Sequence, residues 1–329
     1  MSINSPIAPK TYTLDLKDRK ILYQLDLNSR QSNIQIAKKV GLSKDVVNYR
    51  IKSLDENGFI RGFYTIIDFY KLGYFSVRAY LKLINASSKT EEEIFLFLKN
   101  HNTVFFVNKI DGNFDVGIGT YVENITDFES FSLEFKQKFR EFMGEEQISI
   151  FTKAYHFHRA YLLEKKFDEV DANVVGGRGR EDFDAKDIEI LKFLAVNARI
   201  STLDIATYCE MPATTVAFRI KQLEKKKIIL AYRLNFNFEK FGYEYYKADL
   251  VLNDISRLKE LSNFAHAHPN ILYIDQTIGG SDFEFDVEVK NKKQFLQIID
   301  EIKEKFPEIR QWSYFSVREY KKLLYFPSA

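Results

Sequence analysis

The strongest constraint on the fold of this chain is an internal repeat. Shifting the 329-residue sequence by 169 positions aligns the segment that starts at Leu14 with the segment that starts at Phe183, without a gap over roughly 70 residues. Beyond this stretch the offset falls to 167, so the second copy has a loop that is shorter by two residues. Self-similarity of this kind indicates a tandem duplication, so the fold of one unit should occur twice. Matched positions include Asp15 with Asp184, Asn28 with Asn197, Arg30 with Arg199, Gly73 with Gly242 and Asp115 with Asp282.

The first part of each unit has the pattern of three short helices followed by a wing. In the first copy, apolar residues at helical spacing predict helices over about 16–25, 33–40 and 44–57, and residues 60–67 alternate as in a β-hairpin or wing. Asp15 and Asp18 match an acidic capping box for the first helix, and Ser43 is a suitable N-cap for the third. This arrangement predicts a winged helix-turn-helix, whose third helix enters the major groove of DNA.

The third helix of the first copy exposes side chains of the types that contact DNA. Asn48 can pair with adenine through two hydrogen bonds, and Arg50 can bind guanine or a phosphate. A solvated helix surface has a similar composition, so an ordinary surface is the other interpretation. The candidate DNA contacts of this copy are Ser43, Lys44, Asn48, Tyr49, Arg50 and Lys52, together with Arg61 on the wing.

The corresponding helix of the second copy offers fewer hydrogen-bonding groups. Where the first copy has Gly41, Leu42 and Ser43, the second has Glu210, Met211 and Pro212. We therefore expect two unequal reading heads, of which the first dominates sequence recognition. The second head then reads thymine methyl groups, contacts phosphates only, or has a structural role. Its candidate contacts are Thr214, Thr215, Arg219 and Lys221.

The second part of each unit alternates between strand-like and helical segments. In the first copy the strand-like segments are 77–84, 103–110, 114–122 and 148–155, and the helical segments are 91–100 and 126–142. Their order, βαββαβ, is that of a ferredoxin-like sandwich, and the second copy repeats it from Tyr245 to about Val317. The predicted fold class is α+β, with a winged helix-turn-helix followed by this sandwich, in tandem. The predicted domains are winged helix-turn-helices at 10–67 and 183–236, ferredoxin-like domains at 68–165 and 237–329, and a flexible, glycine-containing linker at 166–182.

Charge and composition limit the possible functions. The net charge is only +2, but residues 10–64 hold 11 Lys and Arg against 6 Asp and Glu, and residues 183–236 hold 9 against 6. Positive charge concentrated on the predicted heads is what nucleic-acid binding requires. Cys209 is the sole cysteine, which excludes an internal disulfide and a cysteine-based metal cluster. The sequence has no apolar run of about 18 residues and no signal-peptide pattern, so we expect a cytoplasmic protein that spans no membrane.

Taken together, these segments resemble the Lrp/AsnC family of bacterial and archaeal transcription regulators. The opening pattern of that family, L-D-x-x-D-x-x-I-L, occurs at 14–22, and its recognition-helix pattern occurs over 41–60. A sensing-domain turn in which Gly precedes Asp before an alternating strand occurs at 112–115. The resemblance implies a DNA-binding regulator without enzymatic activity. It also implies dimerisation through the sensing-domain sheets, which a duplicated chain would replace by an intrachain pseudo-dimer, and further assembly into homo-oligomers.

The resemblance further implies a small-molecule effector, such as an amino acid, that binds near the sensing-domain turn. No cofactor and no metal are implied. The other interpretation of the turn residues is that they only join two strands. The candidate effector contacts are Gly112, Asp115, Gly279, Gly280 and Asp282.

Two other classes of function compete with the regulator. Siroheme decarboxylases are similar to this family and work as pairs of related units, and His156 and His158, followed by Arg159, would offer polar groups to a tetrapyrrole. The second copy has Ser316, Val317 and Arg318 in that region, so the histidine pair is not duplicated. The third class is a ligand-binding or scaffold protein that has lost DNA binding. The pairs His156/His158 and His266/His268 fit packing or surface roles better than metal sites, because a zinc site needs three or four ligands.

Overall fold

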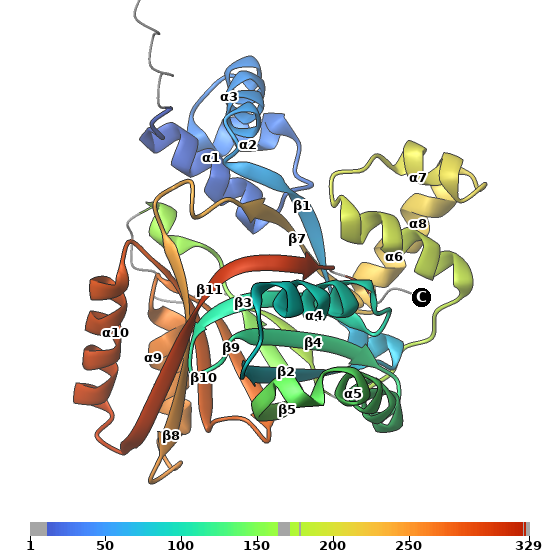
Figure 1. The fold of residues 1–329 in the computed structure, drawn as a ribbon. Helices are drawn as coiled ribbons and strands as arrows, with labels where there is room; N and C mark the ends of the chain where they lie inside the picture. The colour runs from blue at the N-terminus through green and yellow to red at the C-terminus, as the bar shows by residue number, and fades with distance from the viewer. Residues whose placement is uncertain (1–11, 164–171, 178, 325, 327–329) are drawn as a thin grey trace, which may run out of the picture.

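The computed structural model describes residues 12–163, 172–177, 179–324 and 326 (Figure 1). The first head consists of α1 (Leu16–Leu27), α2 (Asn33–Val40), α3 (Lys44–Glu56) and β1 (Ile60–Ile67). The second consists of α6 (Ala185–Val196), α7 (Thr202–Tyr208), α8 (Ala213–Lys225) and β7 (Ile229–Phe236). The predicted order of three helices and a strand is therefore confirmed in both copies.

The local signals that start and end these helices are present in the structure. Asp15 accepts a hydrogen bond from the backbone of Asp18 while the Asp18 side chain accepts one from the backbone of Asp15, which is the predicted capping box. Ser43 caps α3 by accepting from the backbone N–H of Val46. Between α2 and α3 the chain turns at Gly41, where φ is +68°. The second copy makes the same turn at Glu210 with a φ of +51°, so the fold holds a non-glycine residue in a disfavoured conformation there.

The wing at residues 60–67 does not form a local β-hairpin, which was one of the two structures that its sequence predicted. β1 pairs with β7 of the other copy, antiparallel, from Ile60 opposite Phe236 to Ile67 opposite Ile229. The two strands form a separate two-stranded sheet. An alternating strand satisfies its backbone equally well with a distant partner, so local sequence could not distinguish the two pairings.

Each sensing domain has the predicted βαββαβ order. The first contains β2 (Phe75–Leu83), α4 (Ser88–Asn100), β3 (Val104–Gly112), β4 (Val116–Val122), α5 (Ile125–Phe139) and β5 (Met143–His156). The second contains β8 (Glu244–Leu252), α9 (Leu258–Ala267), β9 (Ile271–Ile278), β10 (Phe283–Val289), α10 (Lys292–Lys305) and β11 (Ile309–Leu323). Short 3-10 turns lie at Phe69–Leu72, Arg140–Phe142 and Ala160–Leu163.

The two sensing domains join into one closed barrel. Among the described strands, eight form a ring in the order β2-β4-β3-β11-β8-β10-β9-β5, and β5 pairs back with β2. The copies meet at two antiparallel seams, β3 with β11 and β5 with β9. The helices cover the outside of the barrel (Figure 1), where α5 contributes a row of buried phenylalanines, Phe128, Phe131, Phe135 and Phe139. The intrachain pairing that the duplication implies is therefore present.

Part of the predicted linker is ordered. Asn173–Gly176 form β6, which pairs antiparallel with the end of β5, from Lys153 opposite Gly176 to His156 opposite Asn173. The side chain of Asp68 accepts a hydrogen bond from the backbone N–H of Gly176 at 3.1 Å. The prediction of a wholly flexible segment is thus wrong for these residues, while positions 166–171 and 178 of that segment lie outside the described residues.

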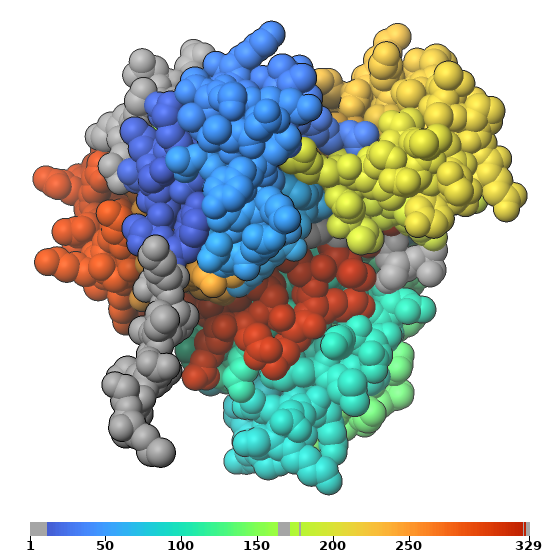
Figure 2. All heavy atoms as spheres, turned by 90° about the horizontal axis from the view of Figure 1, so that it is seen from above, coloured from blue at the N-terminus to red at the C-terminus, as the bar shows by residue number. Residues whose placement is uncertain are grey.

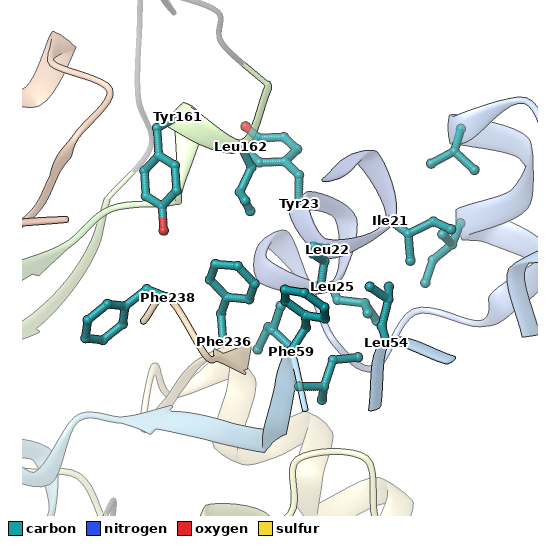
Figure 3. Close-up of a cluster of buried hydrophobic side chains, with 14 of the residues drawn as sticks. Ile21, Leu22, Tyr23, Leu25, Leu54, Phe59, Tyr161, Leu162, Phe236 and Phe238 are labelled. Carbon is teal, nitrogen blue, oxygen red and sulfur yellow. The ribbon is translucent and has the colours of Figure 1, made fainter. Parts of the chain in front are cut away.

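The first head packs on the second half of the chain as well as on its own. Its core, drawn in Figure 3, combines Leu22 and Leu25 of α1 with Phe236 and Phe238 from the second copy and with Leu162 from the connection. The core of the second head likewise includes Ile67 and Leu72 of the first copy. Each head is therefore anchored by apolar burial against its counterpart.

Within the described residues, no helix has both the length and the apolar character needed to cross a membrane. The same part of the chain has no group of three or more His, Cys, Asp or Glu side chains arranged to hold a metal ion.

Candidate nucleic-acid interface

The third helix of the first head presents a polar surface beside its buried stripe. Val47 and Leu54 are fully buried against the head. Lys44, Asn48 and Lys52 are exposed, and the ring of Tyr49 is 73% exposed. A helix with one face buried in a three-helix scaffold and the opposite face polar and open is suited to lie in a DNA groove.

Both arginines among the predicted contacts of the first copy are engaged within the protein. Arg50 Nη1 lies 2.8 Å from Asp15 Oδ2 and 2.7 Å from Asp18 Oδ1, so its guanidinium binds the capping box of α1. These carboxylates raise the pKa of Arg50, chiefly through the hydrogen bond to Asp18. Arg61 is ion-paired with Glu239. Ser43 is exposed, and as the N-cap of α3 its hydroxyl accepts a hydrogen bond from the backbone N–H of Val46.

The second head repeats this arrangement with a poorer surface. Arg219 Nη1 lies 2.8 Å from Asp187 Oδ1 and also binds Asp184, which duplicates the contacts of Arg50. On α8, Thr214 and Lys221 are exposed and Thr215 is partly buried. Phe218, which occupies the position of Tyr49, is 61% exposed. The exposed aromatic ring thus recurs in both heads, whereas the position of Asn48 holds an alanine.

The heads are held together by two arginines at equivalent positions. Arg30 Nη1 donates to the carbonyl oxygens of Ala198 at 2.7 Å and Ile200 at 3.0 Å, in the second head. Arg199 Nη2 donates to Asn33 Oδ1 of the first head at 3.1 Å. Burial lowers the pKa of Arg199, and the nearby charge of Arg30 adds to this effect. These residues did not figure among the candidates, although Arg30 and Arg199 form a matched pair in the repeat.

The same two arginines also stack on equivalent aromatic rings. The guanidinium of Arg30 lies 5.3 Å from the ring centre of Tyr232, and that of Arg199 lies 5.2 Å from the ring centre of Phe63. Both distances are within the range of a cation–π interaction. The side-by-side placement of the heads, visible from above in Figure 2, is therefore fixed by reciprocal contacts.

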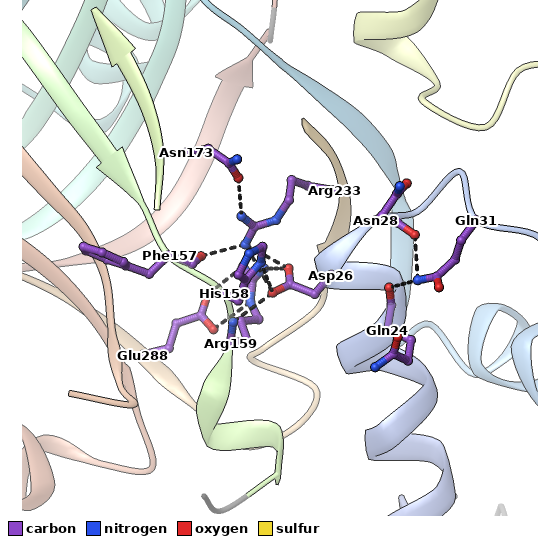
Figure 4. Close-up of polar contacts among 10 residues, drawn as sticks. All are labelled: Gln24, Asp26, Asn28, Gln31, Phe157, His158, Arg159, Asn173, Arg233 and Glu288. Atoms are coloured by element: carbon purple, nitrogen blue, oxygen red, sulfur yellow. Dashed lines mark hydrogen bonds and ion pairs between the residues drawn. The ribbon is translucent and has the colours of Figure 1, made fainter. Parts of the chain in front are cut away.

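A buried ionic cluster connects the first head to the barrel (Figure 4). Asp26 of α1 is fully buried, and its carboxylate lies 3.0 Å from Arg159 Nη1 and 3.2 Å from Arg233 Nη2 of β7. Arg159 Nη2 in turn lies 2.9 Å from Glu288 of β10. Burial by itself would raise the pKa of Asp26, but Arg233 and Arg159 outweigh it and hold that pKa below its ordinary value. Sequence reasoning missed this cluster because its members come from four distant segments.

The predicted effector residues lie on two turns, each of which reaches a seam between the copies through one glycine. Asp115 accepts a hydrogen bond from the backbone N–H of Leu83 at 2.8 Å, and Asp282 accepts one from the backbone N–H of Leu252 at 2.7 Å. Each carboxylate therefore binds its turn to a neighbouring strand. A side chain at Gly112, where φ is +146°, would collide with the backbone of Tyr314 in β11. Gly279 lies against the backbone of Ile148 in β5, and Gly280 lies against Glu284 and Thr277. Through Gly112 and Gly279, each turn therefore contacts a strand of the other copy.

Family models match both heads. A model for winged helix-turn-helix DNA-binding domains matches residues 14–61, and a model for AsnC-type helix-turn-helix domains matches residues 183–224.

Similar proteins match about one copy of the repeat, and a solved structure matches both. The chain is 32% identical to the proline dehydrogenase transcriptional activator of Rhizobium radiobacter over 142 residues, which is 43% of this chain and 84% of that protein. It is 28% identical to the regulatory protein AsnC of Haemophilus influenzae over 119 residues, covering 36% of this chain and 79% of that protein. The siroheme decarboxylase NirDL has a similar fold, with a TM-score of 0.64 at 12% identity over 95% of this chain and 94% of that one. The chain therefore belongs to the Lrp/AsnC family of transcriptional regulators and carries the unit of that family twice.

Proposed function

We propose that this protein binds double-stranded DNA sequence-specifically in the cytoplasm through its two side-by-side heads, and that the first head supplies most of the sequence preference. The observation that carries the proposal is the open polar face of α3, with Asn48, Tyr49 and Lys52 exposed on a helix whose other side is buried. Asn48 reads adenine, and Lys44 and Lys52 neutralise phosphates.

The arginines receive different roles in this proposal. Arg50 and Arg219 position the recognition helices, because their guanidinium groups bind the capping boxes of α1 and α6. Arg61 extends the contact along the backbone of DNA when it leaves Glu239. Thr214, Thr215 and Lys221 of the second head contact phosphates and methyl groups, which contributes affinity more than specificity.

A small molecule, such as an amino acid, modulates this binding in our proposal. The seam turns at Gly112, Asp115, Gly279, Gly280 and Asp282 are its expected location, and further assembly of the pseudo-dimeric barrels would complete the site. The cluster of Asp26, Arg159 and Glu288 supports a route from the barrel to the first head, because it joins α1 to β10. An effector acts only through a difference in its affinity for two arrangements of the heads.

The direct test is binding to DNA fragments by wild type and by an Asn48→Ala/Lys52→Ala variant. The proposal expects a few fragments to be enriched by the wild-type protein and lost in the variant, with a melting temperature that changes little. The matched control is Thr214→Ala/Lys221→Ala in the second head, which should keep the same fragments at reduced affinity. Fragment preference that survives in the first variant and disappears in the control would assign recognition to the second head.

An enzymatic function is the second candidate, because the similarity in fold to NirDL extends over both copies. A siroheme decarboxylase acts on a tetrapyrrole that carries carboxylates. NirDL has been solved in complex with an iron-uroporphyrin III analogue, so titration of the purified protein with that compound, followed by visible absorbance, tests this candidate. A saturable spectral change at one equivalent would favour the enzyme, whereas the regulator proposal expects none.

A further inference from the structure

The barrel encloses a polar lumen. Along β2, Val77, Ala79 and Leu81 face the helices, so the alternate residues Arg78 and Tyr80 face inward. A cavity of about 240 Å³ lies inside, lined by side chains from both copies. Lining residues with charged or hydrogen-bonding groups include Arg78, Asn108, His156, Lys247, Asp275 and Asp286.

The two copies contribute different charges to this lumen. Arg78 pairs with Gly119 across β2 and β4, and Lys247 pairs with Asp286 across β8 and β10, so Gly119 and Asp286 are equivalent positions. Asn108 likewise lies opposite Gly117 across β3 and β4, and Asp275 lies opposite Glu284 across β9 and β10. Glu284 in the second copy therefore occupies the position of Gly117, and Asp275 occupies that of Asn108. The basic residue is retained in both copies, whereas the acidic residues occur only in the second.

Carboxylates therefore outnumber basic groups among the described residues of the lumen. Lys247 Nζ lies 2.8 Å from Glu284, 3.3 Å from Asp275, 3.7 Å from Asp249 and 3.8 Å from Asp286. Arg78 adds a second cation, 3.0 Å from Asp275. Four carboxylates face these two cations, and burial together with neighbouring carboxylates raises the pKa of Asp249 to about 7 and that of Asp286 to about 6. The two cations thus face a larger number of carboxylates.

Several polar atoms in the wall have no hydrogen-bond partner within the described structure. Asn108 is 6% exposed, and its Oδ1 is unpartnered. Asp286 Oδ2 accepts from the hydroxyl of Tyr245 at 2.8 Å, but its Oδ1 has no hydrogen bond. His156 Nδ1 is also unpartnered, and burial lowers the pKa of this histidine to about 4, so the ring is neutral. Buried acceptors without partners cost free energy unless a ligand or water supplies the donor.

Aromatic rings complete the wall. Phe106, Tyr121, Phe151, Tyr273 and Phe315 line the cavity. Leu323 and Leu324, at the end of β11, also line it and are 39% and 36% exposed. Carboxylates combined with aromatic faces favour an organic cation, which gains both ion pairing and cation–π contacts.

We propose that the barrel lumen is a binding site for a small organic ammonium ion, whose N–H groups donate to Asp286 and Asn108 while its carbon skeleton lies against the aromatic wall. An anionic ligand is disfavoured, because it would add negative charge to a site with surplus carboxylates. A metal ion is disfavoured because Lys247 already occupies the point where the four carboxylates converge. The volume fits a ligand smaller than drug-sized molecules.

Calorimetric titration of the full-length protein without DNA tests this proposal, so its outcome is independent of DNA recognition. The probes are n-butylammonium and 1,4-diaminobutane, with 1-butanol and butyrate as controls of similar size. We expect saturable binding of the amines and none of the alcohol or the acid. Butyrate binding as tightly as butylammonium, or no probe binding at millimolar concentration, would overturn the proposal.

Variants locate the site. Asp286→Asn and Asn108→Leu should each weaken amine binding about tenfold or more, which corresponds to about 1.4 kcal/mol. Glu301→Gln, on the exposed surface of α10, is the matched control and should bind as the wild type does. Amine binding that is equally strong in all three variants would place the ligand elsewhere and contradict the proposal. If a lumen variant fails to fold, the comparison of amine, alcohol and acid on the wild type still decides.

Discussion

Arg30 Nη1 lies 2.7 Å from the carbonyl oxygen of Ala198, so a side chain of the first head donates a hydrogen bond to the backbone of the second. The reverse contact runs from Arg199 to Asn33, and Asn33 Nδ2 lies 2.5 Å from Oδ1 of Asn48. The residue that we expect to read DNA is therefore connected by two hydrogen bonds to the other head. A duplicated chain can fix the spacing of its heads in this way without a partner subunit.

Removing the side chain of Arg30, which connects the two heads, should destabilise the protein. Arg30→Ala leaves two carbonyl oxygens without a charged donor, so we expect the free energy of unfolding to fall by about 1.5–3 kcal/mol. Urea unfolding followed by circular dichroism measures this. Lys99→Ala, at an exposed position of α4, is the control and should change stability by less than about 0.5 kcal/mol. Equal stability of the two variants would show that the contact between the heads is not maintained in solution.

The two recognition helices should respond unequally to truncation. Asn48→Ala should weaken binding to preferred DNA by about 1–3 kcal/mol, because it removes a bidentate base contact. Thr214→Ala should cost less than that, because its hydroxyl has no such geometry. Fluorescence anisotropy with a labelled duplex compares them at one salt concentration. Equal losses from the two substitutions would contradict the inequality of the heads.

Arg50 should act on stability rather than on sequence preference. Arg50→Ala removes the ion pair to the buried Asp18 and should lower the free energy of unfolding by about 1–2 kcal/mol. The ranking of DNA sequences bound by the folded variant should stay as in the wild type. A changed ranking of sequences with unchanged stability would instead indicate that Arg50 contacts DNA in the groove.

The lumen carboxylates predict an unusual dependence of stability on pH. The pKa of Asp286 is raised in the folded state, so the folded protein holds this proton more tightly than the unfolded chain does. The ionised carboxylate therefore destabilises the fold above a pH of about 6, and this cost disappears as the pH falls towards the ordinary value of about 4. Asp286→Asn should raise the free energy of unfolding by about 1–2 kcal/mol at pH 8 and by almost nothing at about pH 4.5.

Denaturant midpoints of wild type and Asp286→Asn at the two pH values check this prediction. The Glu301→Gln protein controls for the general effect of losing a negative charge. Stabilisation of the same size at both pH values would contradict the inferred shift in pKa.

Much of the fold follows from local sequence signals. The capping box at Asp15 and Asp18, the N-cap at Ser43 and the phenylalanine row of α5 each fix a helix by interactions within a few residues, so the sequence alone predicts them. The pairing of β1 with β7 and the closure of the barrel depend on contacts between positions that are far apart. An alternating strand specifies which face is buried but does not specify its partner.

The candidate site was predictable to a similar extent. Exposed positions such as Asn48 and Tyr49 follow from helical periodicity, because the opposite face is apolar. The role of Arg50 did not follow, because its acidic partners lie on another helix and only the folded head brings them within 3 Å. The cluster at Asp26 and the lumen carboxylates are also products of tertiary packing. For the lumen carboxylates, the visible signal is that Asn108, Gly117 and Gly119 have acidic counterparts in the second copy.

The most direct test of the central claim is enrichment of genomic DNA fragments by the purified protein across a salt titration. Wild type is compared with Asn48→Ala/Lys52→Ala, and with Lys293→Ala as a control at an exposed position of α10. The account predicts a few strongly enriched fragments for wild type and the control, affinity that falls steeply with salt, and loss of enrichment in the double variant. No enrichment by the wild type at any salt concentration, or enrichment that is the same in the double variant, would contradict sequence-specific binding through the first head.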